Sequence, residues 1–370
     1  MLRASTTLRR SCDARIATRA LTSLSLRHLH QHLDPNHRRP PTVSRRFLSS
    51  SSEESEKVGG VPLPPFVDEV LRGAGQVIFL NSPACGALTL AALGYGDPWL
   101  GALAVLGTTT ATASAHALSL DKDMISAGLA GYNGCLVGCA FSVFLGEPAW
   151  TPSVAVATVI GAAASAPLAS ALKPLCGSVP QFTLAFNMVT LSALSLVKPL
   201  AGAAPADPSV AINAMEWACA PLVGISQIFV VNDALSGAMI LGAIGLYSPA
   251  AAAHTLLGSC VGVGTALALG APASEIGMGL WGFNPALTSL AVSVFFVPGA
   301  PSYALATGGA AATAALFGGA KGFMAAAYGI PAATLPFCAV AASCFFVQRS
   351  APNLLVLAAA PHSPEKNAPP

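Results

Sequence analysis

Four polar side chains in otherwise apolar segments have the chemistry to bind a small neutral solute. They form two pairs, Gln76 with Gln227 and Thr183 with Thr334, and 151 residues separate the members of each pair. Amide and hydroxyl groups exchange hydrogen bonds with such a solute without adding charge to a membrane. Taken singly, Gln and Thr also join membrane helices to one another. Their duplication next to predicted helix breaks favours a role in solute binding.

The composition indicates an integral membrane protein, and the sequence motifs give no indication of an enzyme. Of the 370 residues, 54% are hydrophobic and 9% are charged, whereas a soluble domain has about 25% charged residues. The formal net charge of +2 gives no indication of a nucleic-acid partner. The nine cysteines form no CxxC pair, so we expect packing residues rather than disulfides or metal ligands. No catalytic motif is found, and we expect neither a cofactor nor a metal site.

Residues 1–57 form an Arg- and Ser-rich N-terminal segment. The segment lacks the apolar core of a secretory signal, and its composition is typical of an organellar transit peptide. A disordered tail whose basic residues contact anionic lipid explains the composition equally well. We therefore expect a multi-pass protein of the plasma membrane, or of a mitochondrial or plastid membrane if the segment is a transit peptide.

The rest of the chain contains an internal repeat at the same offset that separates the paired polar residues. Gly128–Asn133 recurs as Gly279–Asn284, and Pro180–Phe186 is similar to Pro331–Phe337. Such self-similarity is typical of transporters built from duplicated units. The sequence predicts four parts: a first transmembrane repeat at 61–203, a linker at 204–213, a second repeat at 214–348 and a polar C-terminal tail at 349–370.

Each repeat contains about five segments long enough to cross a bilayer. The first predicted span of each repeat runs near 77–95 and near 228–247. Because the number of spans is odd, the second repeat enters the membrane from the opposite side, and the two repeats are inverted. The predicted fold class is therefore an all-α integral membrane protein.

Two helix breaks are predicted in each repeat, where Pro, Asn or Asp interrupts the apolar sequence near 81–83 and 232–233 and again just before Thr183 and Thr334. In a bilayer, a broken helix survives only where protein covers it or a wet path runs along it. We expect half-helices to meet at a shared path and to bind a neutral polar solute there. Asn133 and Asn284 are expected to hydrogen-bond to the backbone that is freed at such a break.

Residues 75–83, 128–138 and 181–187 resemble the urea transporter family, and the resemblance extends through both repeats. It implies two inverted repeats of about five transmembrane helices, each with a re-entrant pore half-helix. It also implies passive conduction of urea, and a homotrimer in lipid in which every protomer has its own pore. Urea is flat and neutral, so a narrow slot with polar groups along its wall suits it.

The resemblance also implies the roles of individual residues. Gln76 and Gln227 are the outer polar contacts, and Thr183 and Thr334 bind urea at the middle of the slot. The walls and the narrow part are formed by Phe79, Tyr132, Leu136, Phe283 and Leu287.

Two positions depart from the family pattern. Val230 stands at the second-repeat counterpart of Phe79, so one aromatic wall is missing or is supplied by Phe229 in a shifted register. Ala185 stands where the family has Pro, as Pro336 does in the second repeat. We expect Ala185 to relax the entry of the first pore helix.

Two other functions agree with the residues. The first is a facilitator of another small neutral solute, such as an amide, ammonia or water. The second is a proton- or sodium-coupled urea carrier, which requires a charged group in the path. Only Asp233 and Glu275 are candidates for this role, and neither recurs at the offset because their counterparts are Ser82 and Met124.

Overall fold

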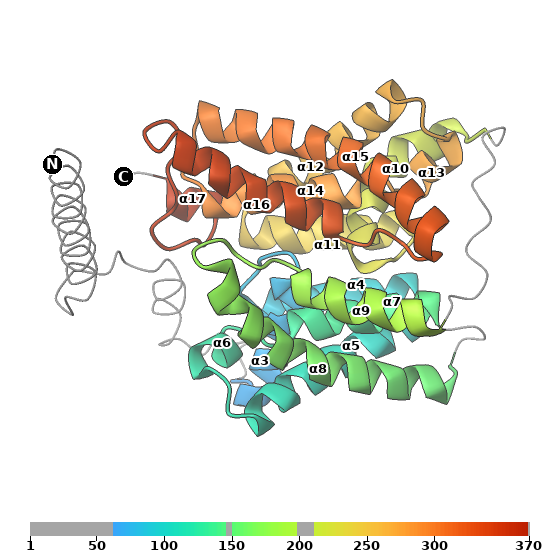
Figure 1. Ribbon diagram of the computed structural model, residues 1–370, viewed down its shortest axis with the longest axis vertical. Coiled ribbons are helices and arrows are strands. Elements are labelled where there is room, and N and C mark those ends of the chain that lie inside the picture. The colour runs from blue at the N-terminus through green and yellow to red at the C-terminus, as the bar shows by residue number, and fades with distance from the viewer. Residues whose placement is uncertain (1–61, 146–149, 198–210, 369–370) are drawn as a thin grey trace, which may run out of the picture. The chain divides into compact units, whose positions relative to one another are not determined.

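The computed structural model describes residues 62–145, 150–197 and 211–368. In these ranges all regular structure is helical, apart from one β-bridge between Phe296 and Leu357 (Figure 1). This confirms the predicted all-α class. The predicted N-terminal segment 1–57 and most of the predicted linker 204–213 lie outside the described residues.

The first half of the sequence forms helices α3 (Pro65–Gln76), α4 (Pro83–Gly96), α5 (Pro98–Ala117), α6 (Lys122–Ser126), α7 (Tyr132–Phe144), α8 (Pro152–Cys176) and α9 (Leu184–Val197). The second half forms α10 (Ala214–Ser226), the short 3-10 helix η1 (Gln227–Phe229), α11 (Ala234–Tyr247), α12 (Pro249–Ala268), α13 (Ala273–Gly277), α14 (Phe283–Phe295), α15 (Ala300–Tyr328), α16 (Leu335–Ser350) and α17 (Pro364–Asn367).

The offset of the sequence repeat reappears in the bounds of these helices. Helices α5, α6 and α7 begin and end at the positions that the offset pairs with the bounds of α12, α13 and α14. The starts of α9 and α16 are paired in the same way. Other pairs differ in their bounds, most clearly α8 with 25 residues and α15 with 29. Each half therefore has the same order of long, short and broken helices.

The first helix break of each half is a sharp turn. Phe79 has φ 60° and Val230 has φ 64°, in the left-handed region that non-glycine residues rarely adopt. Beyond the turn, the Ser82 side chain accepts a hydrogen bond from Cys85 N, and Asp233 Oδ1 accepts one from Ser236 N. These two residues are N-caps, so Asp233 has a structural partner.

The predicted first spans near 77–95 and 228–247 are wrong at their starts. Helices α3 and α10 precede them, and new helices begin only at Pro83 and Ala234. In the second half, the helices before and after the turn meet at an angle of 76°. The breaks near 81–83 and 232–233 were predicted, but the exact place of the turn was not, because the backbone reverses through apolar Phe79 and Val230 rather than through glycine.

The two halves contact each other through equivalent helices. Helix α4 packs against α11, and α9 packs against α16. At the first contact, Ser236 Oγ donates a hydrogen bond to Ala92 O at 2.9 Å. A Cβ atom at Gly96 would lie 2.5 Å from Val231 Cγ1, so the approach requires glycine there.

Three described helices are long and apolar enough to cross a membrane: α8, α12 and α15. The bent pair formed by α10 with η1 and by α11 adds a fourth if it is counted as one span. Shorter apolar helices, α7, α9, α14 and α16, accompany them. The described part of the chain therefore has the composition of a multi-pass membrane protein.

The C-terminal segment folds back onto α12 and α14. Val297 N donates to Val356 O at 2.8 Å, and Ala358 N donates to Phe295 O at 2.9 Å. Glu365 accepts hydrogen bonds from Ser248 Oγ at 2.6 Å and from Ala250 N at 2.8 Å. Because Ser248 is the N-cap of α12, the Glu365 carboxylate adds negative charge at the helix start, where it is stabilising. In the first half, the residue equivalent to Ser248 is Asp97, and its own carboxylate caps the start of α5.

Candidate functional site

The second break of each half brings two threonines together. Phe182 has φ 50° and Ala333 has φ 46°, and the next residues are Thr183 and Thr334, immediately before α9 and α16. Their hydroxyl oxygens lie 2.7 Å apart and form a hydrogen bond. Both residues are buried, with 3% of their surface exposed. The starts of α9 and α16 therefore meet at a pair of hydroxyl groups.

The surroundings of the two threonines are not symmetric. Asn187 Nδ2 donates to Thr334 Oγ1 at 2.8 Å and to Thr183 O at 2.9 Å. The equivalent position in the second half is Cys338, whose Sγ lies 3.2 Å from Thr183 Oγ1. A thiol is a weaker hydrogen-bonding group than an amide. The pair is therefore held more firmly on the Thr334 side.

Two asparagines on α7 and α14 fix the backbone at the starts of α9 and α16. Asn133 Oδ1 accepts from Phe186 N at 3.0 Å, and Asn284 Oδ1 accepts from Phe337 N at 3.2 Å. Asn284 Nδ2 also donates to Ala333 O at 3.1 Å. These contacts confirm the predicted role of both asparagines, because they satisfy backbone groups that the break removes from the helical pattern.

In the first half, the backbone carbonyl of Phe182 is the counterpart of the Ala333 carbonyl, and it has a different hydrogen-bond donor. Tyr132 OH donates to Phe182 O at 2.6 Å, and Asn133 Nδ2 is buried without a partner among the described residues. Phe283, the counterpart of Tyr132, has no hydroxyl group. The tyrosine therefore takes the hydrogen bond that the asparagine makes in the other half.

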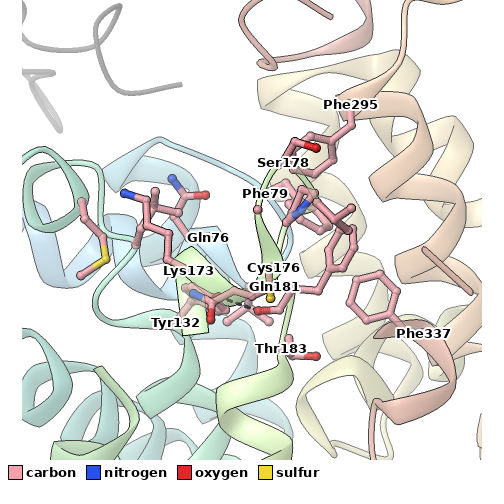
Figure 2. A pocket seen from close by; sticks show the side chains of 17 residues that line it. Gln76, Phe79, Tyr132, Lys173, Cys176, Ser178, Gln181, Thr183, Phe295 and Phe337 are labelled. Atoms are coloured by element: carbon pink, nitrogen blue, oxygen red, sulfur yellow. Dashed lines mark hydrogen bonds between the residues drawn. The ribbon is translucent and has the colours of Figure 1, made fainter. Parts of the chain in front are cut away.

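A pocket of about 180 Å³ leads to Thr183 from the first-half side (Figure 2). Gln76, Tyr132, Gln181 and Thr183 supply polar groups to its wall, which is otherwise mainly apolar. The charged side chain in the lining is Lys173, which is 40% exposed and has its Nζ atom 3.4 Å from Asp121 Oδ2. The pocket thus offers hydrogen bonds at an apolar surface, as sites for small neutral molecules do.

The two glutamines make equivalent contacts. Gln76 Nε2 donates to Ala127 O at 2.8 Å, and Gln227 Nε2 donates to Met278 O at 2.9 Å. One N–H group of each amide thereby fixes the side chain against the loop before α7 or α14. Gln76 lines the pocket and Gln227 does not.

Phenylalanine rings from both halves form part of the pocket wall. The Phe79 ring lies 6.4 Å from that of Phe182 and 5.7 Å from that of Phe295, in edge-to-face geometry. The Phe182 ring also contacts Phe337, with 5.0 Å between centroids. Phe295 and Phe337 come from the second half of the chain. The pocket therefore lies where the halves meet, and flat apolar faces border its polar groups.

Sequence comparison agrees with this arrangement. The family model of the urea transporter matches residues 67–349. The chain therefore belongs to the urea transporter family. Urea transporter 1 of Rattus norvegicus is 33% identical over 306 residues, which cover 78% of this chain and 79% of the relative. Urea transporter 1 of Ovis aries is 32% identical over 305 residues with the same coverage. Because the family consists of transporters, the expectation that the chain is not an enzyme is confirmed.

Within this urea transporter, the structure groups some of the residues assigned from sequence and not others. Gln76, Phe79, Tyr132 and Thr183 line the pocket, and Thr334 reaches it through Thr183. The remaining five lie outside its lining. Leu136 and Leu287 are buried in the core with 1% of their surface exposed, and Phe283 packs against Phe317 with 5.6 Å between ring centroids. Gln227 and Val230 lie at the corresponding turn of the second half.

The two departures from the urea transporter pattern have clear structural outcomes. Val230 shares the positive φ of Phe79, and Phe229 is fully buried, so no shifted register brings Phe229 to the place of Phe79. The second half lacks that aromatic side chain. Ala185 does not change the start of α9, which begins at the position equivalent to the start of α16.

The charges that a coupled carrier would require have structural partners in this urea transporter. Asp233 caps α11. Glu275 forms an ion pair with Lys321 and accepts a hydrogen bond from Trp281 Nε1 at 2.9 Å. Among the described residues no group of three or more His, Cys, Asp or Glu side chains has the geometry to hold a metal ion.

Sequence reasoning missed Phe182, Phe295 and Phe337 as wall residues. Phe182 and Phe337 belong to the two recurring motifs that contain Thr183 and Thr334, so their closeness to the threonines in the sequence could have identified them as wall residues. No feature of the sequence could have identified Phe295, because it lies at the end of α14 in the other half of the chain.

Proposed function

We propose that this protein is a passive urea channel. The relatives are urea transporters by name, and urea is a flat neutral molecule with several N–H donors and one carbonyl acceptor. The observation that carries the proposal is the Thr183–Thr334 hydroxyl pair at the inner end of a pocket bordered by aromatic rings. Urea would slide between the rings and exchange hydrogen bonds with water for hydrogen bonds with these oxygens.

The route we propose passes Gln76 and Phe79, then Tyr132, and reaches the two threonines. It continues on the other side past Phe283 and Leu287 to Gln227 and Val230, with Leu136 narrowing the first side. Selectivity then comes from the width of the slot and from hydrogen-bond replacement rather than from charge. Support for this order comes from the recurrence of the helix bounds in the two halves and from the equivalent glutamine contacts.

Passive transport is favoured over coupled transport by the use of the charged groups. Coupling to protons or sodium needs a charge that is free to bind the ion in the path. Asp233 is engaged as a helix cap, and Glu275 is engaged with Lys321 and Trp281. We therefore do not favour the coupled carrier. A channel specific for another small solute is not favoured because the relatives are urea transporters by name.

The proposed architecture contains two inverted repeats, 61–203 and 214–348, joined by a linker at 204–213 and followed by the tail at 349–370. Each repeat would include a re-entrant pore half-helix, α9 or α16. We further propose a homotrimer in lipid with one pore in each protomer, which the mass of the purified complex would test. Which membrane holds the protein would be decided by locating the full chain in cells.

The test of passive conduction is urea flux into proteoliposomes that contain the full chain, measured by stopped-flow light scattering with and without a proton or sodium gradient. We expect fast urea entry that neither gradient changes. Flux that follows one of the gradients would contradict the channel and support a coupled carrier. No urea flux above that of empty liposomes would refute urea as the permeant.

A further inference from the structure

One amide in the pocket wall lacks a hydrogen-bond partner. Gln181 lines the pocket two residues before Thr183 (Figure 2). Its Oε1 atom is buried and accepts no hydrogen bond from any described residue. An unpaired buried acceptor lowers stability, and native proteins usually pair such groups. The atom has almost no accessible surface in this conformation, but the side chain lines the pocket, so a rotation of the amide would present this acceptor to a donor that enters.

Each of the neighbouring polar groups already makes at least one hydrogen bond within the protein. Tyr132 OH and Phe182 O are bonded to each other, and Thr183 Oγ1 is bonded to Thr334 Oγ1. Gln76 Nε2 is bonded to Ala127 O. Gln181 thus adds an unused acceptor to the pocket wall that also contains Gln76 and Thr183.

The amide is present in one half only. The equivalent of Gln181 is Ala332, which is buried with 2% of its surface exposed. The backbone is the same in both places, because Leu184 N donates to Gln181 O at 3.0 Å and Leu335 N donates to Ala332 O at 3.2 Å. The side chain is therefore not needed to form the turn, since alanine occupies the same turn in the other half.

We propose that Gln181 is a permeant-binding residue that accepts an N–H hydrogen bond from urea just before urea reaches the threonine pair. The inference rests on the proposed function. The side-chain carbonyl oxygen of Gln181 can accept a hydrogen bond from a urea N–H group, and its NH₂ group can donate one to the urea carbonyl. One amide side chain can therefore bind both the donor and the acceptor groups of urea. The binding position is asymmetric, with Gln181 on the first-half side and no amide at Ala332.

Gln181→Met tests this role, because methionine has a similar length and no comparable acceptor. We expect the urea concentration that gives half-maximal flux to rise about 2- to 10-fold, the loss typical of one hydrogen bond. We also expect the unfolding temperature to stay the same or to rise, since the unpaired buried oxygen is removed. A purely structural role predicts the reverse: a lower unfolding temperature with an unchanged half-saturation.

Gln348→Met is the matched control, because Gln348 lies on α16 outside the pocket lining. Its half-saturating urea concentration and its unfolding temperature should both equal those of the wild type. If Gln181→Met does not reconstitute, Gln181→Ala, which copies Ala332, takes its place. An unchanged half-saturation in the presence of normal wild-type flux overturns the role of Gln181 and leaves the urea channel standing. Wild-type flux that never saturates also overturns this role, and absent wild-type flux overturns both proposals.

Discussion

The hydroxyl oxygens of Thr183 and Thr334 lie 2.7 Å apart, although 151 residues separate these threonines in the sequence. Each is the last residue before a helix, and each follows a residue with positive φ. The contact places the equivalent points of the two halves side by side. An asymmetric pair of side chains, Asn187 and Cys338, surrounds it.

The first prediction concerns the energy of this contact. Thr334→Val should destabilise the protein more than Thr183→Val, because it also leaves the Asn187 amide without one of its acceptors. We expect about 1–3 kcal/mol for Thr334→Val and about 0.5–1.5 kcal/mol for Thr183→Val. Unfolding in detergent would measure both, together with the double variant. The two costs should not add, since both single changes break the same bond, and strictly additive costs would argue against the contact.

The second prediction compares the two asparagines. Asn284→Ala removes hydrogen bonds to Phe337 N and Ala333 O, whereas Asn133→Ala removes only the one to Phe186 N. We expect Asn284→Ala to cost about 1–2 kcal/mol more than Asn133→Ala, as one further buried group loses its partner. Thermal unfolding of the two variants side by side gives the difference. Equal costs would show that the two sites are energetically alike despite their different hydrogen bonds.

The third prediction follows from the carbonyl of Phe182. In Tyr132→Phe, the unpaired Nδ2 of Asn133 should take over this carbonyl, as Asn284 does for Ala333. The cost should stay below about 1 kcal/mol. In an Asn133→Ala background the same change should cost about 1–3 kcal/mol, because no donor remains for a buried carbonyl. A double-mutant cycle measures the difference, and identical costs in both backgrounds would contradict the exchange of donors.

The fourth prediction concerns the C-terminal segment and pH. Burial raises the pKa of the Glu365 carboxyl, but hydrogen bonds from Ser248 and the Ala250 amide outweigh it and hold this pKa below the ordinary value of 4.5. A lowered pKa stabilises the folded state above the ordinary value, and this contribution is lost as pH falls through the lowered pKa. The segment should therefore open more often in acid below pH 4.5, although its backbone hydrogen bonds to Phe295 and Val297 remain.

Hydrogen–deuterium exchange of peptides from 351–368, corrected for the intrinsic effect of pH, measures this opening. Glu365→Ala should raise exchange already at neutral pH, by a local cost on the order of 1 kcal/mol or less, because the carboxylate is exposed. Glu216→Gln, at the distant capping box of α10, serves as the control. If the exchange rate depends neither on pH nor on Glu365, the carboxylate does not help to hold the C-terminal segment in place.

The sequence predicted the parts of the site that depend on local motifs. The duplication identified Thr183 with Thr334 and Gln76 with Gln227 as equivalent, and the equivalent hydrogen bonds of these pairs follow from it. The asparagines were predicted to bind freed backbone because a Gly-aromatic-Asn motif recurs at a helix break. These inferences needed only residue type and spacing.

The rest depends on backbone directions that apolar side chains do not reveal. The four breaks were predicted from nearby Pro, Asn and Asp, but the residues that take positive φ there, Phe79, Phe182, Val230 and Ala333, are neither glycine nor asparagine, so the direction of the backbone had no local signal. The direction of these turns decides which rings meet, and it brings Phe295 from the second half to Phe79. The contact of the tail with α12 likewise joins residues that are far apart in the chain.

The most direct test of the channel is the urea permeability of proteoliposomes that contain either the wild type or the variant Thr183→Val with Thr334→Val, at equal amounts of folded protein. Valine keeps the size of threonine and removes its hydroxyl group. The account predicts that the double variant reconstitutes and loses about tenfold or more of its urea permeability, since two oxygens in the path are gone. Equal permeability of the two proteins would contradict it, because urea would then pass without the threonine pair.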